Sequence, residues 1–450
     1  FALFSGFTSD DLIQYLTYYQ IHFLLEFMKR LPRFSLGIGD RFGRQGLAQL
    51  RAFIKLREQT GVVVAPVWNK SNREHIFMGT HPQSVRLEAD ITVQALDWNL
   101  PYFVDADHVA QQNVEKFISS SDFFTLDVAE FMGRPSSDLE IEDFMARHAY
   151  LLSPVEIEGL ESPITLTKEH LRVYLNVTLA AIREAGKLYR YIRGVKGHDD
   201  FVVEISVDET VTPQQPALLL VILAAIGEER IPVQVLAPKF SGRLKKGMDY
   251  AGDPQVFARQ LDANICLLRD AISRYDLPDS LKLSVHYGSD KFSLYPFITD
   301  ALRRHHTGIH IKTAGTTWLA EVVGLALSGG EGLAIAKELY GRALLQFDFL
   351  CQPYQASLEI DTARLPTAEM VSQWTSEQFA RALRHVPEDP LFNGNFRQFM
   401  HVAYKIAAKM GPRFTVQLEA NQEWIEPEVM ANLYDHHLLP IFGSLGQMEA

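Results

Sequence analysis

The residues best suited to chemistry form a run of ionisable side chains at the end of an apolar segment, Val104–His108 (VDADH). Two carboxylates and an imidazole are costly to bury unless they are paired or bind a metal ion. A divalent ion would bind His108 and leave the neighbouring Asp107 to move protons as an acid and base. The structural alternative makes Asp107 the N-cap of a helix that holds His108 in its first turn.

Two further histidines follow apolar residues later in the chain. His286 lies in Leu283–Lys291 (LSVHYGSDK), and His310 lies in Gly308–Thr317 (GIHIKTAGTT). We predict that these two histidines and His108 bind one divalent metal ion. For each histidine taken alone, a structural hydrogen bond is the alternative.

A carboxylate segment offers a substitute ligand. Glu204–Glu209 (EISVDE) alternates polar and apolar residues, so its polar side chains would face one side of a strand. His310 comes early in its segment and would lie deep, so Asp208 or Glu209 is the alternative to it. Both carboxylates, like Asp107, are also candidate catalytic acids or bases. Three imidazoles suit zinc, whereas a carboxylate in place of one of them admits manganese.

Polar residues at the ends of other apolar segments are the predicted contacts of a small ligand. The loop Gly288–Lys291 offers backbone N–H groups and a cation to an anion. The small residues of Lys312–Thr317 suit a carboxylate or phosphate at a helix N-terminus. Solvated turns and ion pairs are the structural alternatives. The predicted substrate-binding residues are Asp40, Arg41, Lys239, Ser289, Asp290, Lys291, Lys312 and Thr313.

The elements that must bring these residues together are eight short apolar runs, each of which ends in polar residues. They are Ser35–Phe42, Val62–Lys70, Pro101–His108, Phe123–Glu130, Phe201–Glu209, Pro232–Lys239, Leu281–Lys291 and Gly308–Thr316. Strands that alternate with helical segments indicate a parallel sheet. Eight such units predict an α/β fold, a (β/α)8 TIM barrel whose site lies at the carboxyl ends of the strands. An open doubly wound sheet is the alternative.

The chain of 450 residues is longer than a typical barrel of about 250 residues. We predict an N-terminal helix within residues 1–34 that caps the bottom of the barrel, followed by a catalytic barrel over residues 35–330. A helical insertion is expected at about residues 131–198, either as a lid or oligomer contact or as a simple solvated face. Residues 331–450 are predicted to form a helical C-terminal extension.

Composition and charge exclude several classes of protein. The net charge of −12 argues against a nucleic-acid partner, because phosphate binding requires a basic face. The two cysteines, Cys266 and Cys351, exclude a disulfide scaffold and favour a cytoplasmic setting. The most hydrophobic stretch, Leu218–Gly227, has about ten residues where a membrane span needs roughly twenty. We therefore expect no membrane partner, and a homo-oligomer stays open.

Six of these segments together resemble the tagaturonate epimerase family, which also includes ketose 4-epimerases. The segments are Gly39–Gly43 (GDRFG), Val104–His108, Ser206–Glu209 (SVDE), Leu236–Phe240 (LAPKF), Val285–Lys291 (VHYGSDK) and Lys312–Thr316 (KTAGT). The resemblance implies a metal-dependent barrel, an isomerase that interconverts tagaturonate and fructuronate at C4. Asp107-His108 also resembles the Asp-His pair of metal-dependent aldolases, in which the histidine binds zinc and the aspartate moves a proton. No glycine follows the histidine here, unlike in those aldolases.

The chemistry of a ketose allows the two resemblances to be joined. C4 lies one bond beyond the acidic C3, so simple deprotonation does not invert it. Cleavage and re-formation of the C3–C4 bond would invert C4, with a metal as Lewis acid and a carboxylate as acid and base. We therefore predict a C4 epimerase of a ketohexuronate or ketohexose. An aldolase or lyase and a non-catalytic sugar-binding protein are the alternatives. Transient oxidation at C4 is disfavoured, because no Gly-x-Gly-x-x-Gly unit is present.

Overall fold

The computed structural model describes residues 30–446, except Glu209, Val211, Tyr287, Ala314, Gly315 and Ala356, and not the side chain of Thr316. The predicted catalytic residue Glu209 therefore lies outside the described residues. Most of the predicted N-terminal helix, residues 1–29, lies outside them as well.

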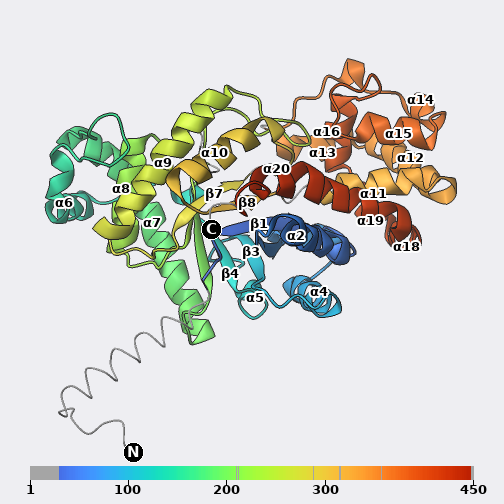
Figure 1. Ribbon diagram of the computed structural model, residues 1–450. Coiled ribbons are helices and arrows are strands. Elements are labelled where there is room, and N and C mark those ends of the chain that lie inside the picture. Colours follow the sequence, from blue (N-terminus) through green and yellow to red (C-terminus); the bar gives the residue numbers. More distant parts are fainter. Residues whose placement is uncertain are drawn as a thin grey trace, which may run out of the picture.

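Eight parallel strands close into a barrel in the described part of the chain, in the order in which they occur (Figure 1). They are β1 (Phe34–Gly39), β2 (Ala65–Asn69), β3 (Phe103–Val109), β4 (Phe123–Asp127), β5 (Val202–Ser206), β6 (Val235–Ala237), β7 (Lys282–His286) and β8 (Ile309–Lys312). The ring is closed by β8 and β1, with Lys312 aligned with Gly37. This confirms the predicted (β/α)8 barrel and excludes the open doubly wound sheet.

The inside of the barrel changes from apolar to polar along the strands. An apolar layer is made of Ala65, Val67, Phe103, Phe123, Val202 and Val235. Because one face of a strand recurs every second residue, the next inward positions lie two residues further along. They hold Asn69, Asp105, Thr125 and Glu204, which with Lys312 form what we call the polar layer. The sequence of the strands thus places ionisable groups at the carboxyl ends, above a packed base.

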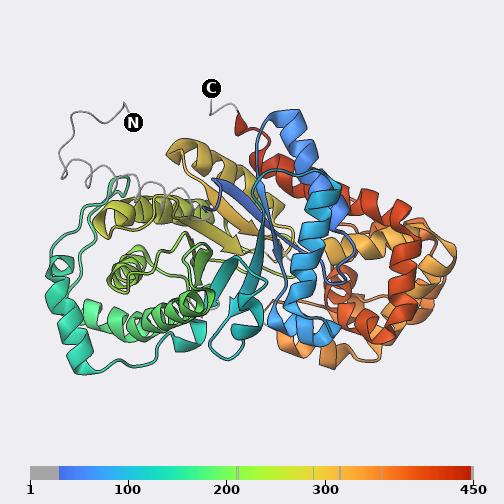
Figure 2. The same cartoon turned by 90° about the horizontal axis from the view of Figure 1, so that it is seen from below.

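Helices surround the barrel (Figure 2). They include α2 (Gly46–Thr60), α3 (Asn72–Met78), α4 (Pro82–Ala95), α7 (Lys168–Lys196), α8 (Pro216–Glu228), α9 (Pro254–Arg274) and α10 (Tyr295–His305). Only α5 (Glu115–Ile118) is helical between β3 and β4, because β3 runs on to Val109 and a turn follows it. Between β4 and β5, η1 (Ala129–Phe131), α6 (Asp138–Arg147) and η2 (Ala149–Leu152) precede α7.

A second hydrophobic core is formed by helices that lie beside the barrel, and Figure 1 shows these helices. It is built by α11 (Thr316–Leu327), α12 (Gly330–Leu344), α13 (Phe347–Cys351), α14 (Ala368–Ser372), α15 (Ser376–Leu383), α16 (Gly394–Val402), α17 (Tyr404–Met410), α18 (Pro412–Ala420) and α19 (Gln422–Leu433). We call these helices the helical layer. None of the helices in the described ranges combines the length and hydrophobicity needed to cross a membrane.

The end of the described chain returns to the barrel. The π-helical turn η6 (Tyr434–Leu438) and α20 (Leu439–Phe442) contribute their apolar side chains to the core of the barrel, near α2 and α10. The helix that follows β8, α11, instead packs its apolar side chains into the second core. The C-terminal segment η6–α20 therefore packs on the barrel next to α2 and α10, whereas α11, which follows the last strand, packs in the second core.

Candidate metal and active site

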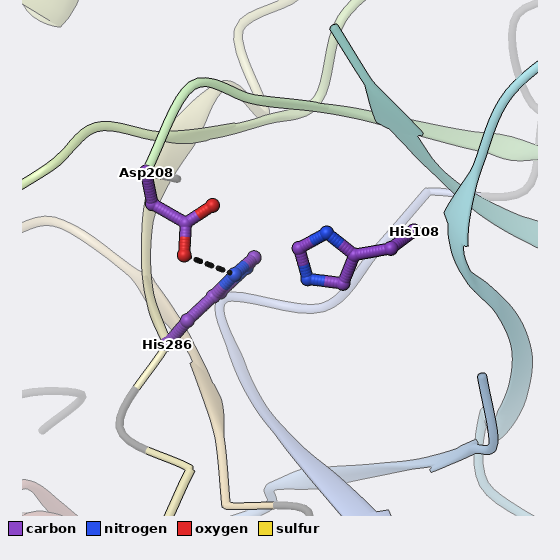
Figure 3. Close-up of side chains that lie close together, drawn as sticks. All are labelled: His108, Asp208 and His286. Atoms are coloured by element: carbon purple, nitrogen blue, oxygen red, sulfur yellow. Dashed lines mark hydrogen bonds and ion pairs between the residues drawn. The ribbon is translucent and has the colours of Figure 1, made fainter. Parts of the chain in front are cut away.

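Three side chains converge at the carboxyl end of the barrel: His108 on β3, His286 on β7 and Asp208 in the turn after β5 (Figure 3). One ligand atom from each lies within 4.8 Å of the others. His286 Nδ1 is 3.1 Å from Asp208 Oδ2, and the two imidazole rings are 5.3 Å apart in an edge-to-face arrangement. Two imidazole nitrogens and one carboxylate oxygen fit a divalent metal such as zinc or manganese.

A distortion of β3 brings His108 into this group. In a regular strand, the side chains of Asp107 and His108 would point to opposite faces. The pairing of β3 with β4 shifts register between Ala106 and Val109, and His108 has a φ of 50°, in the left-handed region. Both side chains consequently reach the mouth of the barrel. Such strain in a residue with a side chain is typical of functional sites.

A buried lysine neutralises the carboxylates below the three ligands. Lys312 Nζ lies 2.7 Å from Asp105 Oδ2, 3.0 Å from Asp107 Oδ1 and 3.6 Å from Glu204 Oε1. It also donates a hydrogen bond of 2.5 Å to Thr125 Oγ1. Lys312 is surrounded by acceptors, so its role in this geometry is to hold a cluster of negative charge together.

The surroundings of both histidines of the cluster favour a positive charge. Burial alone would lower the pKa of His108, but the nearby carboxylates of Asp107 and Asp127 raise it to about 10. Burial acts in the same direction on His286, and Asp208 and Glu204 raise its pKa to about 9. The carboxylates around both rings thus favour a cation, either two protons or a metal ion, at this position.

The carboxylates divide into ionised and protonatable groups. Burial would raise the pKa of Asp107, but Lys312 and His108 hold it below its usual value. Glu204 is similarly buried, and Lys312 and His286 lower its pKa to about 2. For Asp105, burial outweighs Lys312 and, with Asp107 and Glu204 nearby, raises the pKa to about 7. Of the two carboxylates on β3, Asp107 is therefore the one that is held ionised, and its Oδ1 lies 3.9 Å from His108 Nε2.

His310 lies one layer deeper than the cluster. Its Nδ1 is 2.9 Å from Ser35 Oγ, and its ring packs 5.2 Å from the ring of Phe123 in the apolar layer. Burial lowers its pKa to about 3. Among the described residues, the group that could hold a metal ion is His108, His286 and Asp208. Asp208 is one of the two carboxylates that sequence analysis gave as the alternative to His310.

Three of the predicted substrate-binding residues are engaged with the rest of the protein. Ser289 Oγ accepts from Gly247 N at 3.0 Å. Asp290 accepts from Arg397 Nη2 at 2.6 Å, in the helical layer. Lys291 Nζ donates to the carbonyls of Lys245 and Met248 at 2.9 and 2.7 Å, and burial lowers its pKa to about 7. The geometry gives these side chains a part in joining the barrel to the helical layer.

The predicted pair at the end of β1 is also bound internally. Asp40 accepts four backbone N–H groups, from Phe42, Gly43, Arg44 and Gln45. Arg41 contacts Glu74 Oε1 at 3.1 Å and the His401 carbonyl at 3.2 Å, and its guanidinium stacks 3.7 Å above the ring of Tyr404. Arg41 thus links the barrel to the helical layer.

Two further predicted substrate-binding residues, Lys239 and Thr313, lie near Asp208 and at the junction of β8 and β1. Lys239 Nζ donates to the Asp208 carbonyl at 3.3 Å, next to a candidate ligand. Thr313 Oγ1 donates to the Gly37 carbonyl at 3.2 Å, at the junction of β8 and β1. Sequence analysis assigned no role to Asp105, Thr125 or Glu204, although their spacing from the apolar layer is the signal that would have found them.

Comparisons with known proteins identify the family and the fold. A family model of tagaturonate epimerases matches residues 20–410. A tagaturonate/fructuronate epimerase of Thermotoga maritima is 27% identical over 423 residues, which are 90% of this chain and 80% of that protein. The glycerol-bound crystal structure of the fructuronate-tagaturonate epimerase UxaE from Cohnella laeviribosi superposes with a TM-score of 0.74 at 20% identity. It covers 94% of this chain and 84% of that one.

A second crystal structure of the Cohnella laeviribosi protein, in its native form, has a TM-score of 0.73 at 21% identity. It covers 92% of this chain and 82% of that one, so the same barrel and helical layer recur together. The family match spans most of the chain, and the resemblance found in the sequence and the prediction of an isomerase are confirmed. The chain belongs to the tagaturonate epimerase family.

Proposed function

We propose that this protein interconverts fructuronate and tagaturonate by inverting C4, with a divalent metal ion held by His108, Asp208 and His286. Membership of the tagaturonate epimerase family supports the reaction. The single observation that carries the metal dependence is the convergence of these three side chains within 4.8 Å at the barrel mouth. When bound, the ion would polarise the C2 carbonyl as a Lewis acid.

We propose that C4 is inverted by cleavage and re-formation of the C3–C4 bond. Cleavage begins when the C4 hydroxyl loses its proton and C4 becomes an aldehyde carbon, while the electron pair stays on the C2–C3 fragment. The aldehyde then rotates and the bond re-forms on its other face, which returns the proton to the oxygen on C4. The balance needs one base that takes this proton and gives it back.

Asp107 is the proposed base. It lies beside His108 on β3, with Oδ1 3.9 Å from His108 Nε2. Lys312 and His108 hold its pKa below the usual value, which keeps it ionised at neutral pH. Lys312 Nζ contacts Asp107 and is itself held by Thr125 Oγ1 and Asp105. This lysine therefore fixes the position of the Asp107 carboxylate near the proposed metal ligands.

A uronate rather than a neutral ketose is the proposed substrate, with Lys239 as the contact of its C6 carboxylate. Of the three lysines predicted to bind substrate, Lys291 and Lys312 are surrounded by protein acceptors. Among the described residues, Lys239 Nζ contacts the Asp208 carbonyl at 3.3 Å, and the residue is only partly buried. Its ammonium therefore has donors left for a carboxylate at the rim.

The test combines turnover with metal content. Purified protein is incubated with fructuronate, and tagaturonate and any released aldehyde are measured with and without chelator. Conversion to tagaturonate without accumulating aldehyde supports an epimerase, whereas accumulating aldehyde fragments support an aldolase or lyase. Activity that survives full removal of metal contradicts the metal dependence.

A metal measurement then tests the ligand set without relying on activity. Asp208→Ala and His286→Ala are each expected to lose most of the bound ion, because one of three protein ligands is removed. His310→Ala is the matched variant from the deeper layer and is expected to keep it. Loss of metal in His310→Ala together with full occupancy in Asp208→Ala would restore the three-histidine site.

A further inference from the structure

Asn69 is a buried amide whose polar atoms are unused by the protein. It is the last residue of β2 and is 3% exposed. Neither Oδ1 nor Nδ2 has a hydrogen-bond partner among the described residues. Buried polar groups are nearly always hydrogen-bonded, and leaving one without a partner costs folding free energy. Two such atoms on one side chain at the mouth of the barrel therefore require an explanation other than folding.

The glycine opposite provides the space for this side chain. A Cβ at Gly37 on β1 would lie 2.8 Å from Asn69 Nδ2 and 3.1 Å from Lys312 Cγ. Contacts below 3.0 Å force a neighbour to move, so a side chain at position 37 would displace the amide. The absence of a side chain at Gly37 lets Asn69 lean across β1 toward Lys312.

The register places the amide in the same layer as the charged network. Asn69 aligns with Asp105 across β2 and β3, and Gly37 aligns with Lys312 across β1 and β8. Lys312 Nζ in turn contacts Asp107 at 3.0 Å. Asn69 thus belongs to the same layer as the charged network, on the side of the barrel away from Asp208 and His286.

We infer that Asn69 binds a hydroxyl group of the sugar-acid substrate and so positions it for the reaction. The inference rests on the proposed function. An amide offers both a donor and an acceptor, which matches a hydroxyl group that both donates and accepts. A carboxylate only accepts, and a cation would face the ammonium of Lys312. Among groups on a ketohexuronate, hydroxyls are the ones that satisfy both atoms of the amide.

Asn69→Leu tests this role because it keeps the side-chain size and removes both polar atoms. We expect kcat/KM for fructuronate to fall about 10-fold or more, mainly through KM, because the hydroxyl is held in substrate and transition state alike. The melting temperature is expected to stay level or rise, since two unpaired polar atoms leave the interior. Gln45→Leu is the matched control. Gln45 is also a buried amide, but it precedes α2 outside the barrel interior, where its side chain faces Glu321.

Gly37→Ala probes the same contact from β1 and serves if Asn69→Leu does not fold. Its added Cβ should lower kcat/KM in the presence of Asn69, but less in an Asn69→Ala background, where the 2.8 Å clash no longer exists. Near-normal kcat/KM in Asn69→Leu, equal losses in Asn69→Leu and Gln45→Leu, or full additivity of the two alanine variants would each overturn the inference. Wild-type protein is assayed beside them: if it turns over no fructuronate, the proposed function fails first and the inference falls with it.

Discussion

At the scale of single residues, the site is a balance of buried charges of both signs. Lys312 lies among Asp105, Asp107 and Glu204, and the carboxylates around His108 and His286 favour a positive charge there, carried by protonated rings or by a metal ion. Removing one partner of a buried pair leaves the other uncompensated, which is costly. Substitutions here must therefore keep shape while changing a single chemical property.

Asp107→Asn is such a substitution, since it preserves the size and hydrogen-bonding reach of the side chain but cannot take a proton. We expect kcat to fall about 100-fold or more, while the bound metal stays near wild-type stoichiometry because Asp107 is outside the proposed ligand set. Steady-state kinetics and elemental analysis of the same preparation measure both. A variant with near-normal kcat would remove Asp107 from the role of base.

At the scale of elements, close packing between helices decides how the helical layer is held. Gly324 on α11 lies against α19, where an added Cβ would be 2.5 Å from Ile425 Cα and 2.7 Å from the Trp424 carbonyl. Backbone atoms have little freedom to move away, so the two helices approach closely only because residue 324 has no side chain. An alanine at position 324 would gain in helix propensity but would overlap with the backbone of α19.

Gly324→Ala is expected to destabilise the protein by about 1–3 kcal/mol, because overpacking outweighs the gain in helix propensity. Gly194→Ala on α7 is the control, since nothing lies within 4 Å of its added Cβ. That variant should gain about 0.5–1 kcal/mol. Urea denaturation of both variants and wild type measures the difference. Equal stabilisation by the two alanines would contradict the close crossing of α11 and α19.

The strand β7 begins with a lysine that makes stability depend on pH. Lys282 is 4% exposed and donates to the Leu31 and Pro32 carbonyls at 3.0 and 2.5 Å. Burial lowers its pKa from 10.5 to about 7. Between these two values the unfolded chain keeps the proton that the folded protein has lost, so stability rises with pH in that window. Below about pH 7, both states are charged and the cost of burying the ammonium is fully present.

Lys282→Met should abolish this rise. Relative to the variant, wild type is expected to gain up to about 1.4 kcal/mol of unfolding free energy per pH unit above pH 7. Denaturation midpoints at pH 7, 8 and 9 measure the slope. The exposed Lys116→Met serves as control and should follow wild type. Parallel slopes for wild type and Lys282→Met would show that the ammonium stays charged in the folded protein.

At the scale of the whole molecule, the barrel and the helical layer are joined by a buried ionic network. Asp290, in the loop after β7, lies 2.6 Å from Arg397 Nη2, 2.9 Å from His385 Nδ1 and 3.4 Å from His437 Nε2. Burial opposes ionisation, but Arg397 and the histidines hold the pKa of Asp290 well below its usual value. Loops from the catalytic end of the barrel are thereby fixed by helices far along the chain.

Asp290→Asn should destabilise the protein by about 3–5 kcal/mol, because the guanidinium of Arg397 is left buried without its counter-charge. Asp300→Asn, which removes an exposed partner of Arg304, should cost less than about 1 kcal/mol. Thermal unfolding and kcat/KM are measured for both. If Asp290 binds substrate, as sequence analysis predicted, activity would fall while the melting temperature stays close to that of Asp300→Asn.

The sequence by itself determined the order of the strands, the barrel and the residues that face its interior. All eight apolar runs became strands in the predicted order. These features follow from local patterns, since a period of two fixes which side chains share a face. The same pattern carried Asp107, His286 and Lys312 into the site, and six short segments were enough to identify the family.

Only the tertiary structure decided which of these residues meet. His310 and Lys312 share a face of β8, but the depth of the layers leaves His310 against Phe123 and brings Asp208 to the candidate metal ligands His108 and His286. The shift in β3 that turns His108 inward depends on its pairing with β4. Asp290 and Arg397 are separated by more than a hundred residues, so no local pattern announces their contact. Closure of the ring and docking of the helical layer set these distances, because they bring together side chains whose spacing along the chain carries no information about their separation in space.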